Sequence, residues 1–404
     1  MVSGKAARDV AGSVDAFYLP GTGPYVLSHS VGCLPCAART ALESSYLRPW
    51  MEKGGDAWDD WLRGIEEFRA GLAVLFGGAA ADYCPQVNLS SGLAKFLGAL
   101  PAPCSGKRVV LAAEDSFPSL GFVARQAGRV RDSGAAQSAQ AQSARPLDCG
   151  SGLKLIPRAR SPIRIESWEQ ALTDDVRAVL VTHVHSNTGE VAPVREIARL
   201  CAQRDVLCIV DASQSAGILP LSVAEWGAQV VLGSCVKWLC GGPGAGFMWI
   251  SPQIIGALEP VDVGWYSHSA PFEFDIHHFE YAKDARRFWG GTPSVVPFVT
   301  AAASLRLIAD IGVSTIHAHN RRLMHAFVGA LPPAWRVRVR LEDIGGTLCI
   351  PVGVHLDAIR ASLAAAGVRF DCRGSVVRLS FHIFNTVEDA ARIASAWKAG
   401  ARHP

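Results

Sequence analysis

The sequence predicts an α/β fold, with a large domain built on a mostly parallel sheet between helices and a small C-terminal α+β domain. Short apolar segments of strand length alternate with amphipathic segments of helical spacing from about residue 109 to residue 251. This alternation is typical of a parallel sheet that is covered by helices on both faces. After a long helical segment from residue 299, the pattern changes to strands around one helix. A chain of 404 residues is long enough for both domains.

The elements follow from apolar periodicity, taken in chain order. Apolar side chains recur at helical spacing over 35–50 and 57–76, before the sheet begins. Apolar runs bounded by turn residues predict the strands of the large sheet, at 109–112, 176–183, 207–210, 230–233 and 246–251. Helical patterns lie between these runs, at 117–127 and 194–204, with a short helical step at 222–226. In the small domain we expect strands at 335–339, 347–352 and 376–381 and a helix at 356–366.

The positions of glycine and proline residues indicate the expected domain boundaries. Residues 1–28 predict an irregular N-terminal arm, and residues 29–298 form the large domain. Within it, 131–152 is rich in Ala, Ser and Gln and predicts a low-complexity insertion. Residues 299–404 are expected to form the small domain, with a contribution from the arm.

Composition narrows the class of protein. A net charge of +3 without a basic run argues against nucleic acid, and apolar stretches are broken before they reach membrane-spanning length. No apolar segment follows the charges of the first residues, so we expect no signal peptide. The 11 cysteines show no disulfide framework and predict reduced thiols in a cytoplasmic protein. Whether Cys33 and Cys36 form a redox pair stays open.

No metal site is expected from the histidines. His183 and His185 lack a second ligand pair at zinc spacing, and His277 and His278 are adjacent and diverge on any regular element.

A carboxylate and an amine lie at the ends of two predicted strands. Asp211 closes the apolar run at 207–210, and Lys237 lies between the run at 229–236 and a glycine-rich turn. Ligands of such sheets bind beyond the carboxyl ends of the strands. An amine and a carboxylate there suit pyridoxal 5′-phosphate (PLP): the lysine carries the cofactor aldehyde as a Schiff base, and the aspartate keeps the pyridine nitrogen protonated. The alternative is a surface lysine in a loop.

Six sequence blocks carry a resemblance to a known family. In chain order they are 181–189, 211–217, 233–244, 264–268, 288–293 and 377–381. Together they resemble the class V aminotransferase group of fold-type I PLP enzymes and, within that group, kynureninase most. The resemblance spans roughly residues 28–395.

The resemblance implies a cofactor site. Lys237 would be the Schiff-base lysine, Asp211 the partner of the pyridinium nitrogen, and Phe117 the ring that stacks on the cofactor, unless it is an ordinary core residue. The remaining cofactor contacts would be Ser90, Ser91, Gln214, Ser234 and Thr292. The two serines precede Gly92 in a strand-to-helix turn, which suits a phosphate cup of hydroxyls and helix N-terminal amides. The family takes the Thr292 contact from the neighbouring subunit, which implies a homodimer with shared active sites.

The resemblance also implies the substrate contacts. Arg378 would grip the α-carboxylate of an amino acid, since a guanidinium fork matches a carboxylate bidentately; a solvated strand arginine is the alternative. Tyr266 and His268 belong to the segment that approaches the substrate, and Ser30 lies in a matching segment near the N-terminus.

The implied reaction is kynureninase-like hydrolysis, in which water cleaves a Cβ–Cγ bond. Three departures leave a diverged substrate open: Val236 replaces a tyrosine of the family, His29–Gly32 replaces Asn-Ser-Leu-Gly, and Ser119-Leu120 replaces Thr-Asp. A class V aminotransferase or epimerase is an alternative on the same residues. A cysteine desulfurase or C–S lyase is another, with Cys372 as the candidate nucleophile shortly before Arg378. A PLP-fold binding or regulatory module without catalysis is the last.

Overall fold

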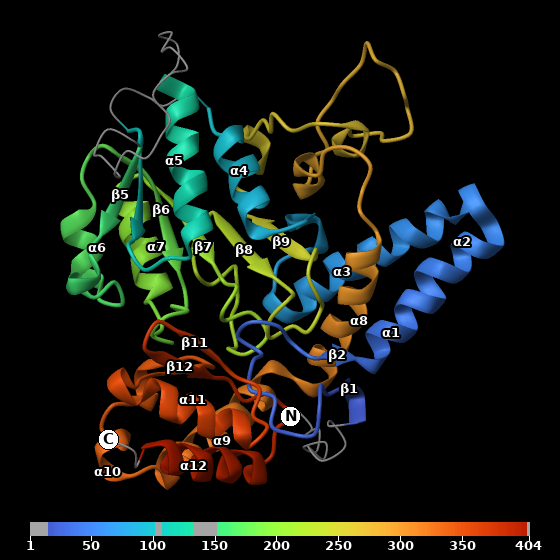
Figure 1. Ribbon diagram of the computed structural model, residues 1–404. Helices are drawn as coiled ribbons and strands as arrows, with labels where there is room; N and C mark the ends of the chain where they lie inside the picture. The colour runs from blue at the N-terminus through green and yellow to red at the C-terminus, as the bar shows by residue number, and fades with distance from the viewer. Residues whose placement is uncertain (1–14, 102–106, 133–151, 402–404) are drawn as a thin grey trace, which may run out of the picture.

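A seven-stranded mixed sheet forms the centre of the protein. The computed structural model describes residues 15–101, 107–132 and 152–401 (Figure 1). The strand order is β3-β9-β8-β7-β6-β4-β5; the strands from β8 to β5 in this order run parallel to one another, and β9 is antiparallel to both β3 and β8. The bounds are β3 (Tyr83–Gln86), β4 (Val109–Ala113), β5 (Leu153–Ile156), β6 (Val176–Thr182), β7 (Leu207–Asp211), β8 (Val230–Ser234) and β9 (Gly246–Ile250). The predicted α/β fold class is confirmed.

The register of the sheet aligns the carboxyl ends of its parallel strands. Asp211 lies opposite Thr182 on one side and Leu232 on the other. The apolar residues of β7 and β8 are buried, because helices cover the sheet and leave these strands no solvated face. The polar residues that end the strands therefore gather along one edge.

Helices of the large domain pack around this sheet (Figure 1). The amphipathic α3 (Trp58–Phe76) lies against α8 (Val296–Ile311), and α4 (Leu89–Ala99) lies against β8 and β9. The others are α1 (Cys36–Ala41), which continues through a π-helical turn at Leu42–Leu47 into α2 (Arg48–Lys53), and α5 (Pro118–Asp132), α6 (Ile165–Ala171) and α7 (Val194–Gln203). Burial of α3 is one-sided, which matches the helical spacing of its apolar residues.

A second hydrophobic core belongs to the C-terminal part of the chain. The three-stranded antiparallel sheet β10-β12-β11 packs with four helices. The bounds are β10 (Leu348–Pro351), β11 (Asp371–Arg373), β12 (Val376–Leu379), α9 (Val313–Ala330), α10 (Pro333–Arg336), α11 (Leu356–Ala365) and α12 (Val387–Ala401). The described end of the N-terminal arm joins this core: Val26 donates to the carbonyl of Arg369 at 2.9 Å and accepts from the amide of Ser380 at 3.0 Å.

Several expected elements differ in the structure. The strand expected at 335–339 is wrong, because Pro332 and Pro333 offer no amide hydrogens and Pro333 begins the short helix α10. The step at 222–226 is a series of turns. The strands β3, β5 and β11 were not predicted because they are only three or four residues long. The low-complexity insertion at 131–152 lies outside the described residues except at its two ends.

The long helix expected from residue 299 is broken. It consists of α8 and α9, which meet at Gly312 with a bend of 74°. Gly312 has a φ of 90°, in the region that favours glycine. Residues of α8 belong to the large core and most buried residues of α9 to the small one, so packing changes near this bend. Among the described residues no single helix has the length and hydropathy to span a membrane, and α8 with α9 meets that test only as this bent pair.

Candidate active site

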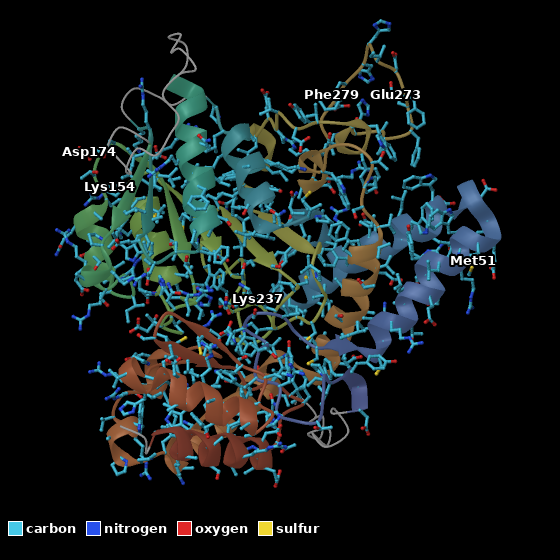
Figure 2. All side chains as sticks on the ribbon, in the orientation of Figure 1. Met51, Lys154, Asp174, Lys237, Glu273 and Phe279 are labelled. Atoms are coloured by element: carbon cyan, nitrogen blue, oxygen red, sulfur yellow. The ribbon has the colours of Figure 1, made fainter. Side chains whose placement is uncertain are left out.

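The amine of Lys237 and the carboxylate of Asp211 stand at the same edge of the sheet. Asp211 ends β7, and Lys237 lies in the turn that follows the neighbouring strand β8. The Asp211 side chain is buried and its Oδ1 accepts from the amide of Ser213 at 2.9 Å. Figure 2 shows Lys237 where the sheet meets the small domain.

The surroundings of Lys237 prepare its amine for reaction. Burial lowers the pKa of Lys237, the negative charge of Asp211 opposes that shift, and the positive charges of Arg378 and Arg373 add to it. A lowered pKa increases the neutral fraction of the amine at a given pH, and the neutral form is the one that attacks an aldehyde.

A segment from the N-terminal region covers the Lys237 turn. The amide of Gly32 donates to the carbonyl of Val236 at 2.8 Å, and Ser30 is held in a turn because its amide donates to the carbonyl of Leu27 at 2.7 Å. Gln214 follows Asp211 and its Nε2 donates to the carbonyl of His29 at 3.0 Å. The Gln214 Oε1 is buried and has no hydrogen-bond partner among the described residues. This oxygen is free to accept from a hydroxyl or protonated group of a bound molecule.

Arg378 is held in a network with Asp371. The Nε of Arg378 donates to Asp371 Oδ1 at 2.8 Å, its Nη2 donates to Oδ2, and its Nη1 donates to the carbonyl of Ser186 at 3.1 Å. A guanidinium has five hydrogens, so one remains on each terminal nitrogen. Those two hydrogens can be donated to another carboxylate.

His29 completes this network from the other side. Its Nε2 lies 3.0 Å from Asp371 Oδ1 and its Nδ1 lies 2.8 Å from Ser380 Oγ. Burial lowers the pKa of His29, so the ring is neutral at pH 7. The neutral ring donates Nε2–H to Asp371, and its Nδ1 lies beside the hydroxyl of Ser380, which donates to the carbonyl of Val26 at 3.0 Å. Asp371 is therefore oriented by two side chains at once.

The serines expected to hold a phosphate meet at the same edge. Gln86, at the end of β3, pairs with Gly246, which pairs in turn with Ser234 at the end of β8. The helix α4 starts directly after β3, and it carries Ser90 and Ser91 in its first turn. The Asn88 side chain caps this helix by accepting from the amide of Ser91 at 2.9 Å. Hydroxyls and helix N-terminal dipole together suit a phosphate.

Phe117 lies just before α5, beside the end of β6. Its ring is 47% exposed, unlike the large core phenylalanines. The neighbouring Ser116 Oγ accepts from Thr182 Oγ1 at 3.2 Å, which ties this segment to the strand edge. An exposed ring at this edge can stack on a planar ligand.

Three residues predicted for the active site lie far from Lys237 in the same chain. Tyr266, His268 and Thr292 belong to the segment 264–292, whose outer part carries Glu273 and Phe279, far from Lys237 (Figure 2). Tyr266 is buried against Trp289, with ring centroids 5.0 Å apart, and Thr292 Oγ1 accepts from Trp265 Nε1 at 3.0 Å. Within the described residues of one chain, no hydrogen bond or ion pair joins this group to Lys237 or Asp211.

Sequence reasoning missed the groups that orient Arg378. Asp371 and His29 are the main ones, and Arg373 also reaches the loop after β6, donating from Nη1 to Ser186 Oγ at 2.8 Å. A signal for Asp371 was present: the two-residue turn at Gly374 between Arg373 and Val376 sets the hairpin register and places Asp371 opposite Arg378. Asp115, after β4, and His185, after β6, form a buried pair whose Oδ1 and Nδ1 atoms lie 3.0 Å apart. The sequence carried no signal for this pair, because the two residues are distant in sequence.

Comparison with known proteins identifies the family. The family model described as Aminotransferase class-V matches residues 139–393. The chain belongs to the class-V aminotransferase family. Among relatives of this class-V chain, the uncharacterized aminotransferase YcbU of Bacillus subtilis is 28% identical over 340 residues, which cover 83% of each chain. A kynureninase of Deinococcus radiodurans is 27% identical over 325 residues, covering 78% of this chain and 73% of the relative. The predicted resemblance is confirmed.

Solved structures share the fold of this class-V chain. A cysteine desulfurase of Thermococcus onnurineus superposes with a TM-score of 0.77 at 18% identity, covering 92% of this chain and 93% of the other. A mutant of C-DES with glycine covalently linked to its PLP cofactor gives a TM-score of 0.78 at 20% identity, covering 93% and 97%. At such identities the likeness concerns the fold alone.

PLP is the cofactor of this class-V enzyme, and the residues present fit it. Four groups lie at the carboxyl ends of the parallel strands: the amine of Lys237 with its lowered pKa, the buried carboxylate of Asp211, the unpartnered Oε1 of Gln214 and the exposed ring of Phe117. They offer an amine, an acceptor for a ring N–H, an acceptor for a hydroxyl and a stacking surface. The first turn of α4 would receive the phosphate.

Proposed function

We propose that this PLP-dependent enzyme is a kynureninase-like hydrolase, which acts on an α-amino acid with a carbonyl at Cγ and cleaves its Cβ–Cγ bond with water. The substrate is kynurenine or a diverged analogue. When bound, the cofactor supplies an electron sink for the amino acid. Lys237 holds and moves the proton at Cα, because its amine is neutral at a lower pH than an ordinary lysine. Asp211 keeps the proton on the ring nitrogen.

Arg378 binds and orients the α-carboxylate in this proposal. Its fork towards Asp371 is filled, which leaves one hydrogen on Nη1 and one on Nη2 for the substrate. Asp371 therefore fixes the plane of the guanidinium before the substrate arrives. A pre-oriented guanidinium loses less conformational entropy on binding than a free arginine side chain does.

The protonation and strand pairing of two thiols near Arg378 argue against a desulfurase. Cys372 lies in β11 opposite Val377, and Cys349 lies in β10 opposite Arg378. Burial raises the pKa of Cys372 and raises that of Cys349 to about 12, so both are protonated thiols at pH 7. A desulfurase needs a mobile, nucleophilic thiolate. Strand pairing makes these thiols immobile and protonation makes them poor nucleophiles. Both properties argue against C–S cleavage and favour hydrolysis, although solved structures with a similar fold include a cysteine desulfurase.

Transamination is the second candidate, because the relative YcbU is described as an aminotransferase. Lys237, Asp211 and Arg378 would serve both reactions. One experiment separates them: the purified enzyme is mixed with kynurenine while its visible spectrum and anthranilate fluorescence are followed. Release of anthranilate and alanine supports the hydrolase. Consumption of kynurenine that depends on a 2-oxo acid, without anthranilate, replaces it by the aminotransferase. A spectrum that kynurenine leaves unchanged moves the search to other amino acids.

A homodimer with shared active sites is part of the proposal. Thr292 is exposed, and the segment before it exposes the large side chains of Phe274 (75%) and Ile276 (94%). An exposed apolar group of this size favours a protein contact. In a dimer, Thr292, Tyr266 and His268 would serve the site of the partner subunit. Light scattering coupled to size-exclusion chromatography tests this, and a monomer at working concentration contradicts it.

A cytoplasmic location is the last part of the proposal. All nine cysteines among the described residues are free, including Cys33 and Cys36, which suits a reducing compartment.

A further inference from the structure

A cavity of about 630 Å³ lies between the large and the small domain. Its large-domain wall comes from Arg158, which follows β5, and from the loop 187–190 after β6. Its small-domain wall comes from the segment 337–344 and from the strands β10, β11 and β12, which face the large domain in Figure 1. Neither Lys237 nor any residue predicted to hold the cofactor lines it. A cavity of this volume can hold a small organic molecule.

Positive charge exceeds negative charge in the wall of this cavity. Four arginines line it against two carboxylates, and the six residues are Arg158, Arg338, Arg340, Arg373, Glu190 and Asp343. None of the four guanidinium groups forms an ion pair within the parts of the chain that the structure describes. Like charges around one cavity repel each other, so an anion bound among them would lower the energy. A ligand with two negative charges would balance the surplus.

Two of these arginines are held in place and two have free donors. Arg338 stacks on the ring of Trp335, with its guanidinium carbon 4.6 Å from the ring centroid, and its Nη1 donates to the carbonyl of Pro351 at 3.2 Å. Arg373 Nη1 donates to Ser186 Oγ and to the neighbouring Asn187 Oδ1, at 2.8 and 2.7 Å. The side chains of Arg158 and Arg340 are exposed and make no hydrogen bond to any described residue. Their donors are therefore available to a ligand.

Apolar side chains complete the wall. They come from Val337, Val339, Ile344, Pro351 and Val376. Pro351 and Val376 are cross-strand partners on β10 and β12, so they form one continuous apolar surface. An inorganic ion would leave this surface exposed to water, whereas the apolar part of an organic anion would cover it.

The cavity is coupled to the Arg378 network through Ser186. Val376 lies two residues before Arg378 on β12, so both side chains point to the same face of the small sheet. The Ser186 hydroxyl accepts from Arg373, and its carbonyl accepts from Arg378 Nη1 at 3.1 Å. Burial and the positive charge of Arg378 lower the pKa of Arg373. An anion near Arg373 would relieve this repulsion.

We propose that this cavity is a second binding site, which takes a doubly charged organic anion, a phosphate monoester or a dicarboxylate with an apolar body. Arg158 from one domain and Arg338 and Arg340 from the other donate to the anionic oxygens, since a guanidinium matches phosphate and carboxylate alike. The apolar residues contact the body of the ligand. The bound anion thereby joins the two domains. The site does not depend on the reaction proposed for Lys237, so failure of one proposal leaves the other untouched.

The test uses full-length enzyme saturated with PLP, in a phosphate-free buffer at about pH 8, where a phosphate monoester carries two charges. Phenyl phosphate and glutarate are titrated separately by calorimetry, and the tighter ligand identifies the preferred anionic group. We expect one site per chain and a higher thermal midpoint with the ligand bound. Arg158→Gln and Arg340→Gln should each weaken binding at least about tenfold, because each removes hydrogen bonds to a charged group. Arg392→Gln, an exposed position of α12 outside the cavity, should leave binding unchanged.

Four results would overturn the proposal. The first is no binding of either anion at millimolar concentration. The second is binding that Arg378→Ala abolishes but Arg158→Gln and Arg340→Gln do not weaken, which would place the anion in the active site. The third is an equal loss in Arg392→Gln, which would show only a general attraction to positive charge. The fourth is inorganic phosphate that binds as tightly as phenyl phosphate, which would remove the role of the apolar wall. Arg158 and Arg340 are exposed, so their replacement is compatible with folding.

Discussion

Asp371 and Arg378 face each other across the antiparallel strands β11 and β12, and the carboxylate accepts hydrogen bonds from both Nε and Nη2 of the guanidinium. His29 binds the same carboxylate from the N-terminal segment, at 3.0 Å. The side chain expected to grip the substrate is thus part of a fixed network. It joins the small domain to the segment that covers the Lys237 turn.

The first prediction concerns Arg378→Ala. Its removal should raise KM for the amino-acid substrate by at least about tenfold while PLP affinity changes little, because the lost guanidinium contacts the α-carboxylate and not the cofactor. Loss of one partner of a buried charged pair costs about 2–5 kcal/mol, part of it through the unpaired Asp371. Steady-state kinetics and PLP titration measure the two effects. Arg373→Ala, in the same hairpin, is the control, and an equal rise in KM there would reassign the carboxylate site.

The second prediction concerns acid stability. Burial acts to raise the pKa of Asp371, but the hydrogen bonds from His29 and Arg378 outweigh it and hold the pKa well below its usual range. The folded state therefore binds this proton less readily than the unfolded chain, whose aspartates titrate near pH 4. The stabilisation is complete above about pH 5 and is lost as the pH falls through the unfolded and then the folded pKa.

Urea unfolding of Asp371→Asn checks this dependence. The variant should be less stable than the wild type at pH 7, and its free energy of unfolding should fall less steeply below about pH 4. Parallel pH profiles for the two proteins would show that Asp371 is not held in this network in solution.

The strand ends of the large sheet were predictable from sequence, and so were the residues that they carry. Apolar runs of strand length ended at Asp211 and shortly before Lys237. The carboxyl ends of parallel strands lie on the same side of a sheet, however the connecting helices pack. The partners of Arg378 were not all predictable. His29 is separated from Asp371 by more than 300 residues, so only the packing of the N-terminal segment on β12 reveals the contact.

Proline and glycine account for the expectations that failed in the C-terminal part. The apolar pattern at 335–339 suited a strand, yet Pro333 fixes a helical start in front of it. The pattern after 299 suited one long helix, yet Gly312 bends it. Periodicity reports which side chains are buried, and a single residue with a fixed or permissive φ decides the path of the backbone.

The third prediction concerns Lys237→Ala. The variant should lose the visible absorption of lysine-bound PLP and all turnover, since Lys237 is the buried amine whose charge interacts with that of Asp211. A spectrum recorded after dialysis against PLP measures the first effect. Lys154→Ala, on the edge strand β5, should keep both properties. Wild-type turnover in Lys237→Ala would remove the central assignment.

The fourth prediction concerns Cys372→Ala. Activity on the amino-acid substrate should stay within about twofold of the wild type, because the thiol is protonated and paired in β11. The assay also includes cysteine as substrate, with sulfide release as readout. A loss of sulfide release in the variant, together with sulfide release by the wild type, would favour the desulfurase.

The fifth prediction concerns Gly32→Ala. A Cβ at this position would stand 2.2 Å from the carbonyl oxygen of Lys237 and 2.7 Å from Cys240 Sγ. The carbonyl belongs to the backbone, so a rotamer change cannot relieve the clash, and either the N-terminal segment or the Lys237 turn must shift. Overpacking of this kind costs about 1–3 kcal/mol. We therefore expect a lower thermal midpoint and weaker PLP binding, measured by scanning calorimetry and PLP titration.

Gly329→Ala is the matched control for this substitution. Gly329 lies in α9 and an added Cβ there meets nothing within 4 Å, so alanine should keep or raise the thermal midpoint through its higher helix propensity. If Gly32→Ala matches the control in both midpoint and PLP affinity, the N-terminal segment is loosely held over the Lys237 turn. If only PLP affinity falls, the segment stays in place and the turn yields, which would show that the contact at Gly32 sets the position of the reactive amine.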